Sequence, residues 1–175
     1  MDGVEHYNIK NNDVFILNYV KSAVSNRNKT DWSDGIMTTV QQIPSLNTYS
    51  AIDTSSMFYE CRKLKTICKL NTSNVTNMSY MFKNCTSLTS IPEMDTSNVT
   101  DMGYMFNSTR IKTIPLLNTS NVTSMLYMFN YSNLKTIPKL DTSKVTTMYS
   151  MFYCFKIETI PEIDTTNVTS MTYMF

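Results

Sequence analysis

The fold is decided by the stretch NTSNVTNMSYMFKNCTSLTSIPEM, residues 71–94. Closely similar text returns four times along the chain, beginning at Asp95, Asn118, Asp141 and Asp164. The Phe that closes each Met-Phe pair falls at positions 58, 82, 106, 129, 152 and 175, so the successive spacings are 24, 24, 23, 23 and 23. A unit this short cannot bury its own apolar face and must stack on a neighbour. The sequence therefore predicts a repeat solenoid.

Within one coil, apolar residues recur about every third position, at Val75, Met78, Met81, Cys85, Leu88, Ile91 and Met94. A continuous helix would drift off this spacing, and a long strand would alternate by two. We expect brief extended segments at 75–78 and 88–91, and a helical or 3₁₀ turn at 79–83. The proline that follows each second segment ends it, because proline cannot donate to a strand ladder. The six Phe residues should stack at a pitch of about 5 Å.

The repeat sets the domain organisation. Residues 43–175 form the solenoid, and residues 43–66 are expected to be a degenerate capping coil, in which Ala51 and Thr54 replace the usual Val and Met. Residues 1–42 show no repeat and are expected to form an N-terminal cap or an attachment segment. The sequence ends at Phe175 within a unit, which predicts truncation: either further coils follow, or another subunit covers this end.

Composition argues against several classes of function. The 15 basic and 14 acidic residues leave a net charge of +1, which gives no basic footprint for nucleic acid or an anionic membrane. No window approaches 18 consecutive apolar residues, and the first residues lack the pattern of a secretory signal peptide. The single histidine, His6, lies outside the repeats, and no phosphate-loop, dinucleotide or zinc-protease motif occurs. The sequence predicts no enzyme activity, no metal and no cofactor.

A cysteine column could form a disulfide, and an aspartate column could bind calcium. Cys61 and Cys85 hold the same position in adjacent coils, so stacking brings their Cα atoms to about 5 Å. They are either small apolar fillers or a disulfide, and the spacing leaves both open. Asp95, Asp141 and Asp164 open their units beside Thr residues, a setting that favours turn capping over calcium binding.

The text LTSIPEMDTSNVTDMGYMF, residues 88–106, resembles the BspA-type leucine-rich repeat. More narrowly, it resembles a subfamily of bacterial surface proteins whose units read D-T-S-N-V-T-x-M-x-x-M-F-x-x-C-x-x-L. This resemblance covers residues 43–175 and implies an α/β, leucine-rich-repeat-like solenoid with short stacked parallel strands and short helical turns. It also implies a cell-surface or extracellular location and a role in adhesion. Similar repeats are found in phage proteins.

Two sets of outward positions are candidates for ligand binding. The first is an aromatic column that could stack on sugar rings or anchor a protein partner, or could be a half-buried ladder: Tyr80, Tyr104, Tyr127 and Tyr173, with Tyr149 beside the interrupting Ser150. The second lies just after each Phe and varies from coil to coil, as specificity positions of solenoids do: Lys83, Asn84, Asn107, Asn130, Tyr131 and Tyr153. A lysine column is expected to be a solvated face: Lys65, Lys112 and Lys135.

These features predict a non-catalytic, surface-exposed binding or adhesion module for protein or glycan ligands. The alternative is a structural component of a phage virion, a head or tail decoration or fibre protein docked by residues 1–42. Residues 1–42 and the open C-terminal coil could then contact virion neighbours or further copies of the chain. The virion would be its location if a phage encodes it.

Overall fold

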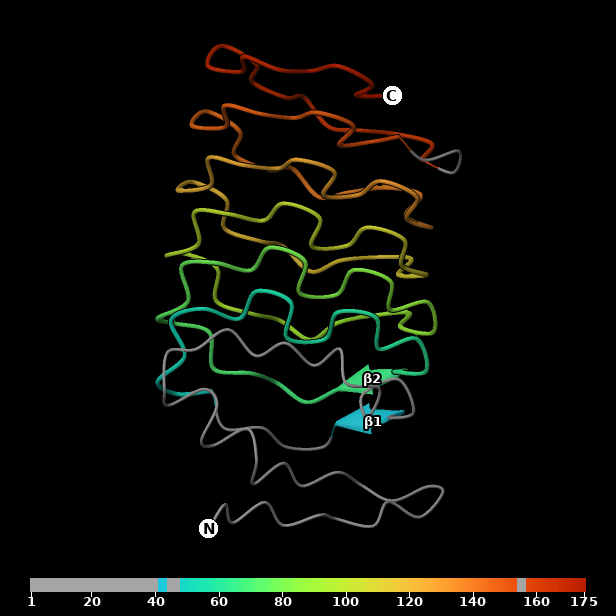
Figure 1. Cartoon of the computed structure of the whole chain (residues 1–175). Helices are drawn as coiled ribbons and strands as arrows, with labels where there is room; N and C mark the ends of the chain where they lie inside the picture. The colour runs from blue at the N-terminus through green and yellow to red at the C-terminus, as the bar shows by residue number, and fades with distance from the viewer. Residues whose placement is uncertain (1–40, 44–47, 154–156) are drawn as a thin grey trace, which may run out of the picture.

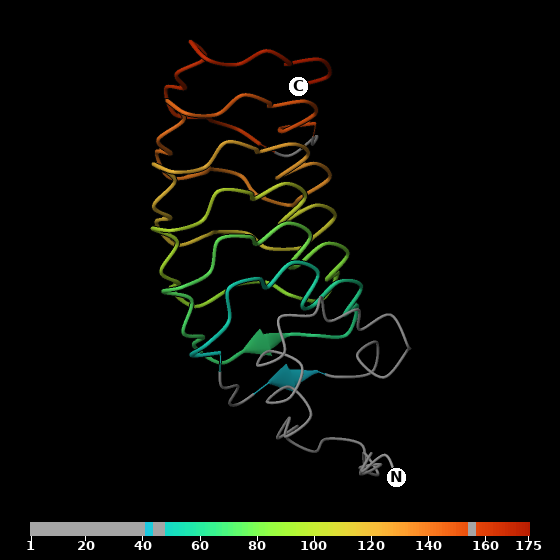
Figure 2. The same cartoon turned by 60° about the vertical axis from the view of Figure 1, so that its left-hand side comes forward.

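A computed structural model describes residues 41–43, 48–153 and 157–175. The chain forms a stack in which each coil lies on the previous one, with the C-terminus in the last coil (Figures 1 and 2). Strand β1 (Gln42–Ile43) pairs in parallel with strand β2 (Thr66–Ile67). Gln42 lies opposite Thr66 and Ile43 opposite Ile67, so the register is one repeat. Residues 1–40, which contain most of the expected cap or attachment segment, lie outside the described residues.

Further pairing between coils consists of single parallel bridges. One column of bridges runs through the expected extended segment at 75–78, joining Asp53, Asn77, Asp101, Ser124, Thr147 and Ser170 in succession. Another bridge joins Thr136 to Thr159. Each of these two residues immediately precedes an Ile-Pro pair, and β1 and β2 occupy the equivalent positions in their own repeats. Partners are one repeat apart throughout. Short parallel pairing between neighbouring coils is thus present, although outside β1 and β2 it does not reach the length of a strand in the described residues.

Turns replace the helical segment expected at 79–83, and the described residues contain no helix. The Met81 N–H donates to the Met78 carbonyl at 3.2 Å and the Lys83 N–H to the Tyr80 carbonyl at 3.0 Å. Tyr80 itself has φ 60°, in the left-handed region that a right-handed helical turn does not enter. This geometry frees the Tyr80 N–H to donate to the Gly103 carbonyl of the next coil at 2.8 Å. Bonding between coils therefore takes the place of bonding within a helix.

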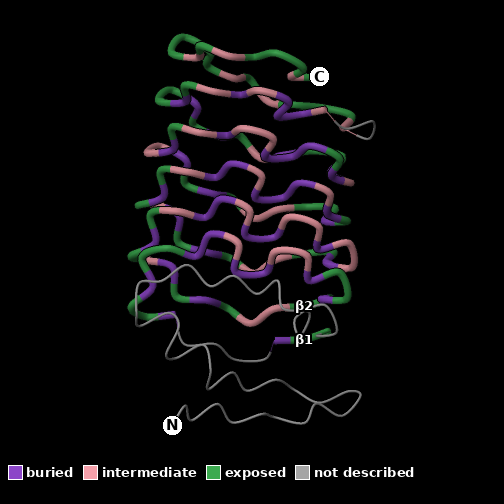
Figure 3. The backbone as a smooth tube through the Cα atoms, viewed as in Figure 1, coloured by how far each residue is buried: buried purple, intermediate pink, exposed green. Residues whose placement is uncertain are grey.

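The core lies between the two sides of each coil (Figure 3). The inward positions predicted from the sequence are buried, except that Ile91 is only partly buried against the core. Inner Phe rings such as Phe82 and Phe106 are fully buried, and the rings of successive coils are stacked with centroids 5.5–5.9 Å apart. The predicted phenylalanine column is confirmed. Each ring from Phe82 to Phe152 has a stacked Phe ring on both sides, so the column ties the coils together.

Polar side chains fasten each coil to the next. The Thr72 hydroxyl donates to the Asp95 carbonyl at 2.7 Å, and the Asn98 side-chain amide donates to the Ser73 carbonyl at 2.8 Å. Within a coil, the Asp95 carboxylate accepts from the Ser97 N–H at 3.0 Å, and these hydrogen bonds from Ser97 lower the pKa of Asp95. The same arrangement recurs at Asp141 and Asp164. The Asp column therefore caps turns, as its sequence predicted.

Cys61 and Cys85 are free thiols. Cys61 and Cys85 are buried, and the Cys85 thiol donates to the Phe58 carbonyl at 2.9 Å. Burial, with the neighbouring Cys61, raises the pKa of Cys85 well above its ordinary value. The pair therefore fills a column of the core without a disulfide.

Candidate functional site

The outward columns predicted to bind ligands lie on segments that are hydrogen-bonded directly from coil to coil. In one pair of coils, the Tyr127 N–H donates to the Tyr149 carbonyl at 2.9 Å, the Phe129 N–H to the Met151 carbonyl at 3.0 Å, and the Tyr131 N–H to the Tyr153 carbonyl at 3.0 Å. Met128, Phe129 and Asn130 are buried, while Tyr127 and Tyr131 on either side of them are not. We call the outward side of these segments the tyrosine face. Its backbone is held in place at every second residue.

Two columns of the tyrosine face have a left-handed backbone. Their φ angles lie between 53° and 63°, in one column at Ser56, Tyr80, Tyr104, Tyr127, Ser150 and Tyr173, and in the other at Glu60, Asn84, Ser108 and Tyr131. This region costs an L-residue about 1 kcal/mol or more, and Asn or Gly enters it most readily. Half of these positions nevertheless carry Tyr. The backbone does not favour tyrosine here, so its ring contacts must compensate.

The first three tyrosines of the column form a closed stack. Tyr80 and Tyr104 have ring centroids 4.5 Å apart and planes inclined by 10°, and Tyr104 and Tyr127 are 4.6 Å apart at 18°. The rings cover each other's faces and are half-buried. Burial raises the pKa of the Tyr104 phenol, and the neighbouring Tyr80 and Tyr127 add to this effect. Of the two possibilities left open by the sequence, the half-buried ladder describes this part of the column.

The stack opens in the C-terminal coils. Ser150 interrupts the column, and the ring of the preceding Tyr149 takes the vacant level, 5.2 Å from Tyr127 with an interplanar angle of 49°. Tyr173 then lies edge-on to Tyr149 at 5.8 Å and 81°. Tyr131 and Tyr153, in the column positions after Phe, also meet edge-on, at 5.5 Å and 85°. These rings no longer lie parallel, and Tyr131 is 55% exposed.

Lys83 lies over the closed stack. Its Nζ atom is 4.7 Å from the Tyr104 ring centroid, 5.2 Å from that of Tyr80 and 5.8 Å from that of Tyr59. These are cation–π distances. Tyr59 was not among the predicted site residues. Its signal was present in the sequence, because Tyr59 follows Phe58 as Lys83 follows Phe82.

The predicted asparagines have different environments. Asn107 and Asn130 are buried, with 6% and 4% of their surface exposed. The Asn107 amide donates to the Asn130 side-chain oxygen at 3.0 Å, and the Asn130 amide donates to the Ser150 carbonyl at 3.4 Å. These two residues brace the coils and do not offer free groups to a ligand, which corrects the sequence prediction. Asn84 is half-buried, and its amide donates to Glu60 at 3.3 Å.

Charge divides the tyrosine face into two halves. The N-terminal coils carry Asp53, Glu60, Arg62, Lys83 and Asp101 on or beside it. The corresponding segments 124–134, 145–153 and 165–175 contain no Asp, Glu, Lys or Arg. The closed part of the stack is thus flanked by charged side chains, and the open part is neutral.

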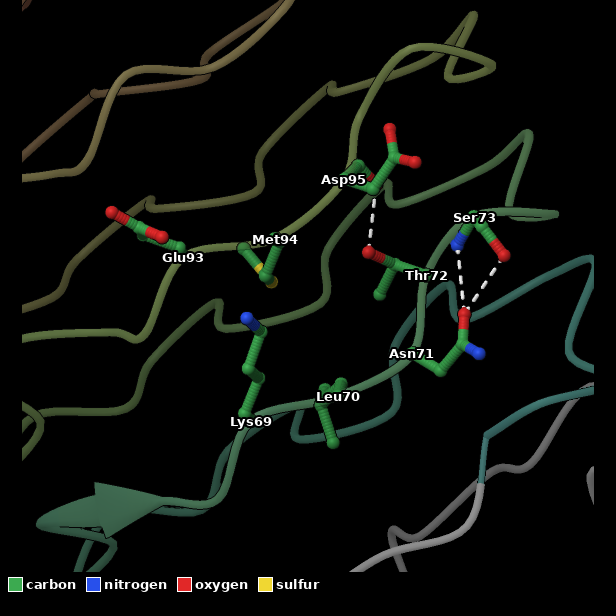
Figure 4. A pocket seen from close by; sticks show the side chains of 8 residues that line it. All are labelled: Lys69, Leu70, Asn71, Thr72, Ser73, Glu93, Met94 and Asp95. Carbon is green, nitrogen blue, oxygen red and sulfur yellow. Dashed lines mark hydrogen bonds between the residues drawn. The ribbon is translucent and has the colours of Figure 1, made fainter.

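A shallow hollow between coils was not predicted from the sequence. It is lined by residues 69–73 of one coil and 93–95 of the next, with Lys69, Glu93 and Asp95 at its rim (Figure 4). The repeat forms a similar hollow at residues 139–143 and 162–166. The lining hydroxyls of Thr72 and Ser73 are engaged in hydrogen bonds with the protein itself. The hollow is a consequence of coil stacking.

The remaining predictions concern charge and the membrane. Lys65, Lys112 and Lys135 are exposed, as expected for a solvated face, and Lys135 pairs with Glu158 at 2.7 Å. The described part of the chain contains no cluster of three or more His, Cys, Asp or Glu side chains suited to a metal ion. Within that same part, no helix has the length and apolar character needed to cross a membrane.

Comparison with known proteins gives one match. Residues 29–133 and 132–175 match the protein family described as "Mycoplasma protein of unknown function, DUF285". The match supports a relation to repeat proteins of bacterial surfaces and does not extend to the narrower D-T-S-N-V-T subfamily. It begins within the segment 1–42 that shows no repeat. No curated protein and no solved structure matches the chain.

Proposed function

Since the chain belongs to the family described as "Mycoplasma protein of unknown function, DUF285", we propose that it is a non-catalytic binding module of the adhesion type. It recognises protein or glycan ligands at a cell surface or in the extracellular space. The observation that carries this proposal is the tyrosine face, a row of aromatic side chains on a backbone fixed from coil to coil. The leucine-rich-repeat-like solenoid is part of the same proposal, supported by parallel pairing one repeat apart.

The chemistry of the tyrosine face suits binding. Tyrosine offers a large, stiff apolar ring and a hydroxyl, and therefore supplies contact area at a low cost in side-chain entropy. The hydrogen bonds between coils hold these rings before any ligand arrives, which lowers the entropy lost on binding. Tyr80, Tyr104 and Tyr127 also occupy backbone positions where Asn or Gly would cost less. Unfavourable backbone geometry of this kind clusters at functional sites.

Flow cytometry with the fluorescently labelled full chain tests the proposal on intact epithelial cells. The informative variant replaces Tyr104, Tyr127 and Tyr149 together by Ser, a residue found at each of these column positions in another coil. We expect it to lose most of the cell binding. The control replaces Lys65, Lys112 and Lys135 by Gln, and should bind as the unmodified chain does. Circular dichroism verifies that each variant is folded. Equal binding by the folded tyrosine variant, or no binding by the unmodified chain, would contradict the proposal.

The virion alternative depends mainly on residues 1–42, of which the structure describes only the last two. No described contact favours it, and it stays a prediction from the sequence.

A further inference from the structure

Two pairs of tyrosines lie on two adjacent segments in the open half of the tyrosine face. Tyr127 and Tyr131 are carried by one coil, and Tyr149 and Tyr153 by the next. The backbone N–H groups of Tyr127 and Tyr131 donate to the carbonyls of Tyr149 and Tyr153, which fixes both pairs at the same level. We call these four residues the tyrosine cluster. Beneath it, the buried Asn130 amide donates to the Ser150 carbonyl and braces the two segments.

Tyr127 belongs to both the closed stack and the cluster: it is stacked on Tyr104 and inclined to Tyr149. The ring orientations distinguish the rest of the cluster from the closed stack. In the closed stack, rings 4.5–4.6 Å apart cover each other's faces. In the cluster, Tyr127 and Tyr149 are inclined by 49°, and Tyr131 and Tyr153 by 85°. Inclined rings cannot cover each other completely, so part of an aromatic face is left to contact another molecule. Tyr131 is the most open of the four, with 55% of its surface exposed.

The surroundings of the cluster select the chemistry of its ligand. Segments 124–134 and 145–153 carry no charged side chain, so an ionic ligand finds no counter-charge on them. What they offer outward is aromatic rings, phenol hydroxyls and small polar groups such as Thr147. A ligand that fits has flat C–H surfaces to lie against a ring and hydroxyl groups to bond with phenols. A neutral sugar has both.

The small exposed area of the cluster also favours a sugar over a protein partner. A stable protein–protein interface buries about 800 Å² on each partner. Four tyrosines, each with a total area of roughly 150–250 Å² and most of them half-buried, expose less than that. A protein partner of ordinary size would have to extend well beyond these four residues. One or two sugar units would fit within the neutral region.

We propose that the tyrosine cluster of Tyr127, Tyr131, Tyr149 and Tyr153 is a subsite for a neutral saccharide. This inference rests on the proposed binding function and names its ligand class and its location. One sugar ring lies against the exposed aromatic surface around Tyr131 and Tyr149, and the phenol hydroxyls bond with sugar hydroxyls.

Other coils carry, at the equivalent positions, residues that the same backbone conformation accepts, and these residues guide the choice of substitutions. Asn84 occupies the position equivalent to Tyr131 with φ 63°, so Tyr131→Asn keeps the left-handed turn. Ser79 occupies the position of Tyr149, so Tyr149→Ser removes that ring on an accepted backbone. The matched control is Tyr49→Ser, which removes an exposed ring outside the segments of the tyrosine face, at a position where Ser73, Ser97, Ser120 and Ser143 stand in other coils.

The full chain is titrated with lactose, maltotriose and 3′-sialyllactose, and binding is followed by saturation-transfer NMR and calorimetry. We expect a neutral sugar to bind, with each cluster substitution weakening affinity at least tenfold and Tyr49→Ser changing it less than twofold. Cell binding is measured in parallel, before and after periodate oxidation of the cell-surface glycans. Oxidation should abolish it.

The outcomes separate the two proposals. Cell binding that survives periodate, with no sugar bound in solution, would overturn the saccharide subsite and leave a protein ligand for the binding function. Loss of sugar affinity in Tyr49→Ser equal to that in Tyr149→Ser would overturn the location. Tighter binding of 3′-sialyllactose than of lactose or maltotriose would refute the assignment of the ligand as a neutral sugar. No binding to sugars or cells would overturn the function and the subsite together.

Discussion

Replacing Phe106 by Ala tests how much of the stability resides in the phenylalanine column. Phe106 is fully buried and has stacked Phe rings at 5.9 Å on both sides. The matched control is Phe175→Ala, in the last member of the same column. Phe175 has a stacked neighbour on one side, at 5.8 Å, and 67% of its surface is exposed.

The two expected losses differ by a factor of about three or more. Truncating a fully buried Phe to Ala costs about 3–5 kcal/mol, which includes lost burial and the cavity left behind. Phe106 also loses two aromatic contacts, each worth about 0.5–1.5 kcal/mol beyond burial, so the upper half of that range is expected. Only a third of Phe175 is buried, and it has one such contact. Its truncation should cost about 1 kcal/mol.

Urea unfolding of the full chain, followed by circular dichroism, measures both losses under the same conditions. The slope of free energy against urea must stay constant for the comparison to hold, because a solenoid can unfold in parts. If Phe106→Ala costs less than about 1 kcal/mol, or no more than Phe175→Ala, the column is not what ties the coils together.

Three further predictions follow from the backbone and the pKa shifts. Ser150→Gly should stabilise the chain by about 0.5–1 kcal/mol in the same urea assay because φ is 54° there, whereas Ser79→Gly, at a position without positive φ, should destabilise it. Hydrogen bonds from Ser97 hold the pKa of Asp95 below 3.8. The contribution of the Asp95 carboxylate to the stability of the fold is therefore complete above pH 3.8 and is lost as the pH falls through the lowered pKa. Asp95→Asn should reduce this acid sensitivity in thermal melts. Burial raises the pKa of Tyr104 above 10.0, so the folded state favours the neutral phenol. The stability of the fold should be constant below pH 10 and decline as the pH rises through the raised pKa. Tyr104→Phe should show less of this decline.

The stacking of the coils could be predicted because the repeat dictates it. Once a unit of 23 or 24 residues recurs in one chain, equivalent residues must fall into columns, and the apolar columns must face inward. The phenylalanine column, the buried Val and Met positions and the Asp turn caps followed from this alone.

Local backbone geometry could not be predicted in the same way. The segment 79–83 has the polar and apolar spacing of a helical turn, but Tyr80 adopts a left-handed conformation that sequence propensity disfavours for tyrosine. The N–H groups of Tyr80 and Phe82 donate to the next coil, while those of Met81 and Lys83 close turns within their own coil. Bonding between neighbouring coils decides the outcome, and a propensity for a single segment contains no information about it. Asn107 and Asn130 were misjudged for the same reason: variable asparagines on an outward column turned inward to bond with each other.

The order of two residues shows how the repeat can change its surface without changing its fold. In one coil the chain reads Ser79-Tyr80, and in another Tyr149-Ser150. Both Tyr80 and Ser150 have the left-handed backbone, so the turn is preserved, but the ring moves to the preceding residue. From there Tyr149 still reaches the level of the stack, at 5.2 Å from Tyr127, although its plane is inclined by 49°. Exchanging the two residues therefore keeps the hydrogen bonds between coils and converts a closed stack into an open one. A solenoid can vary its binding surface by such exchanges because its stability resides in the inward columns, which the exchange does not touch.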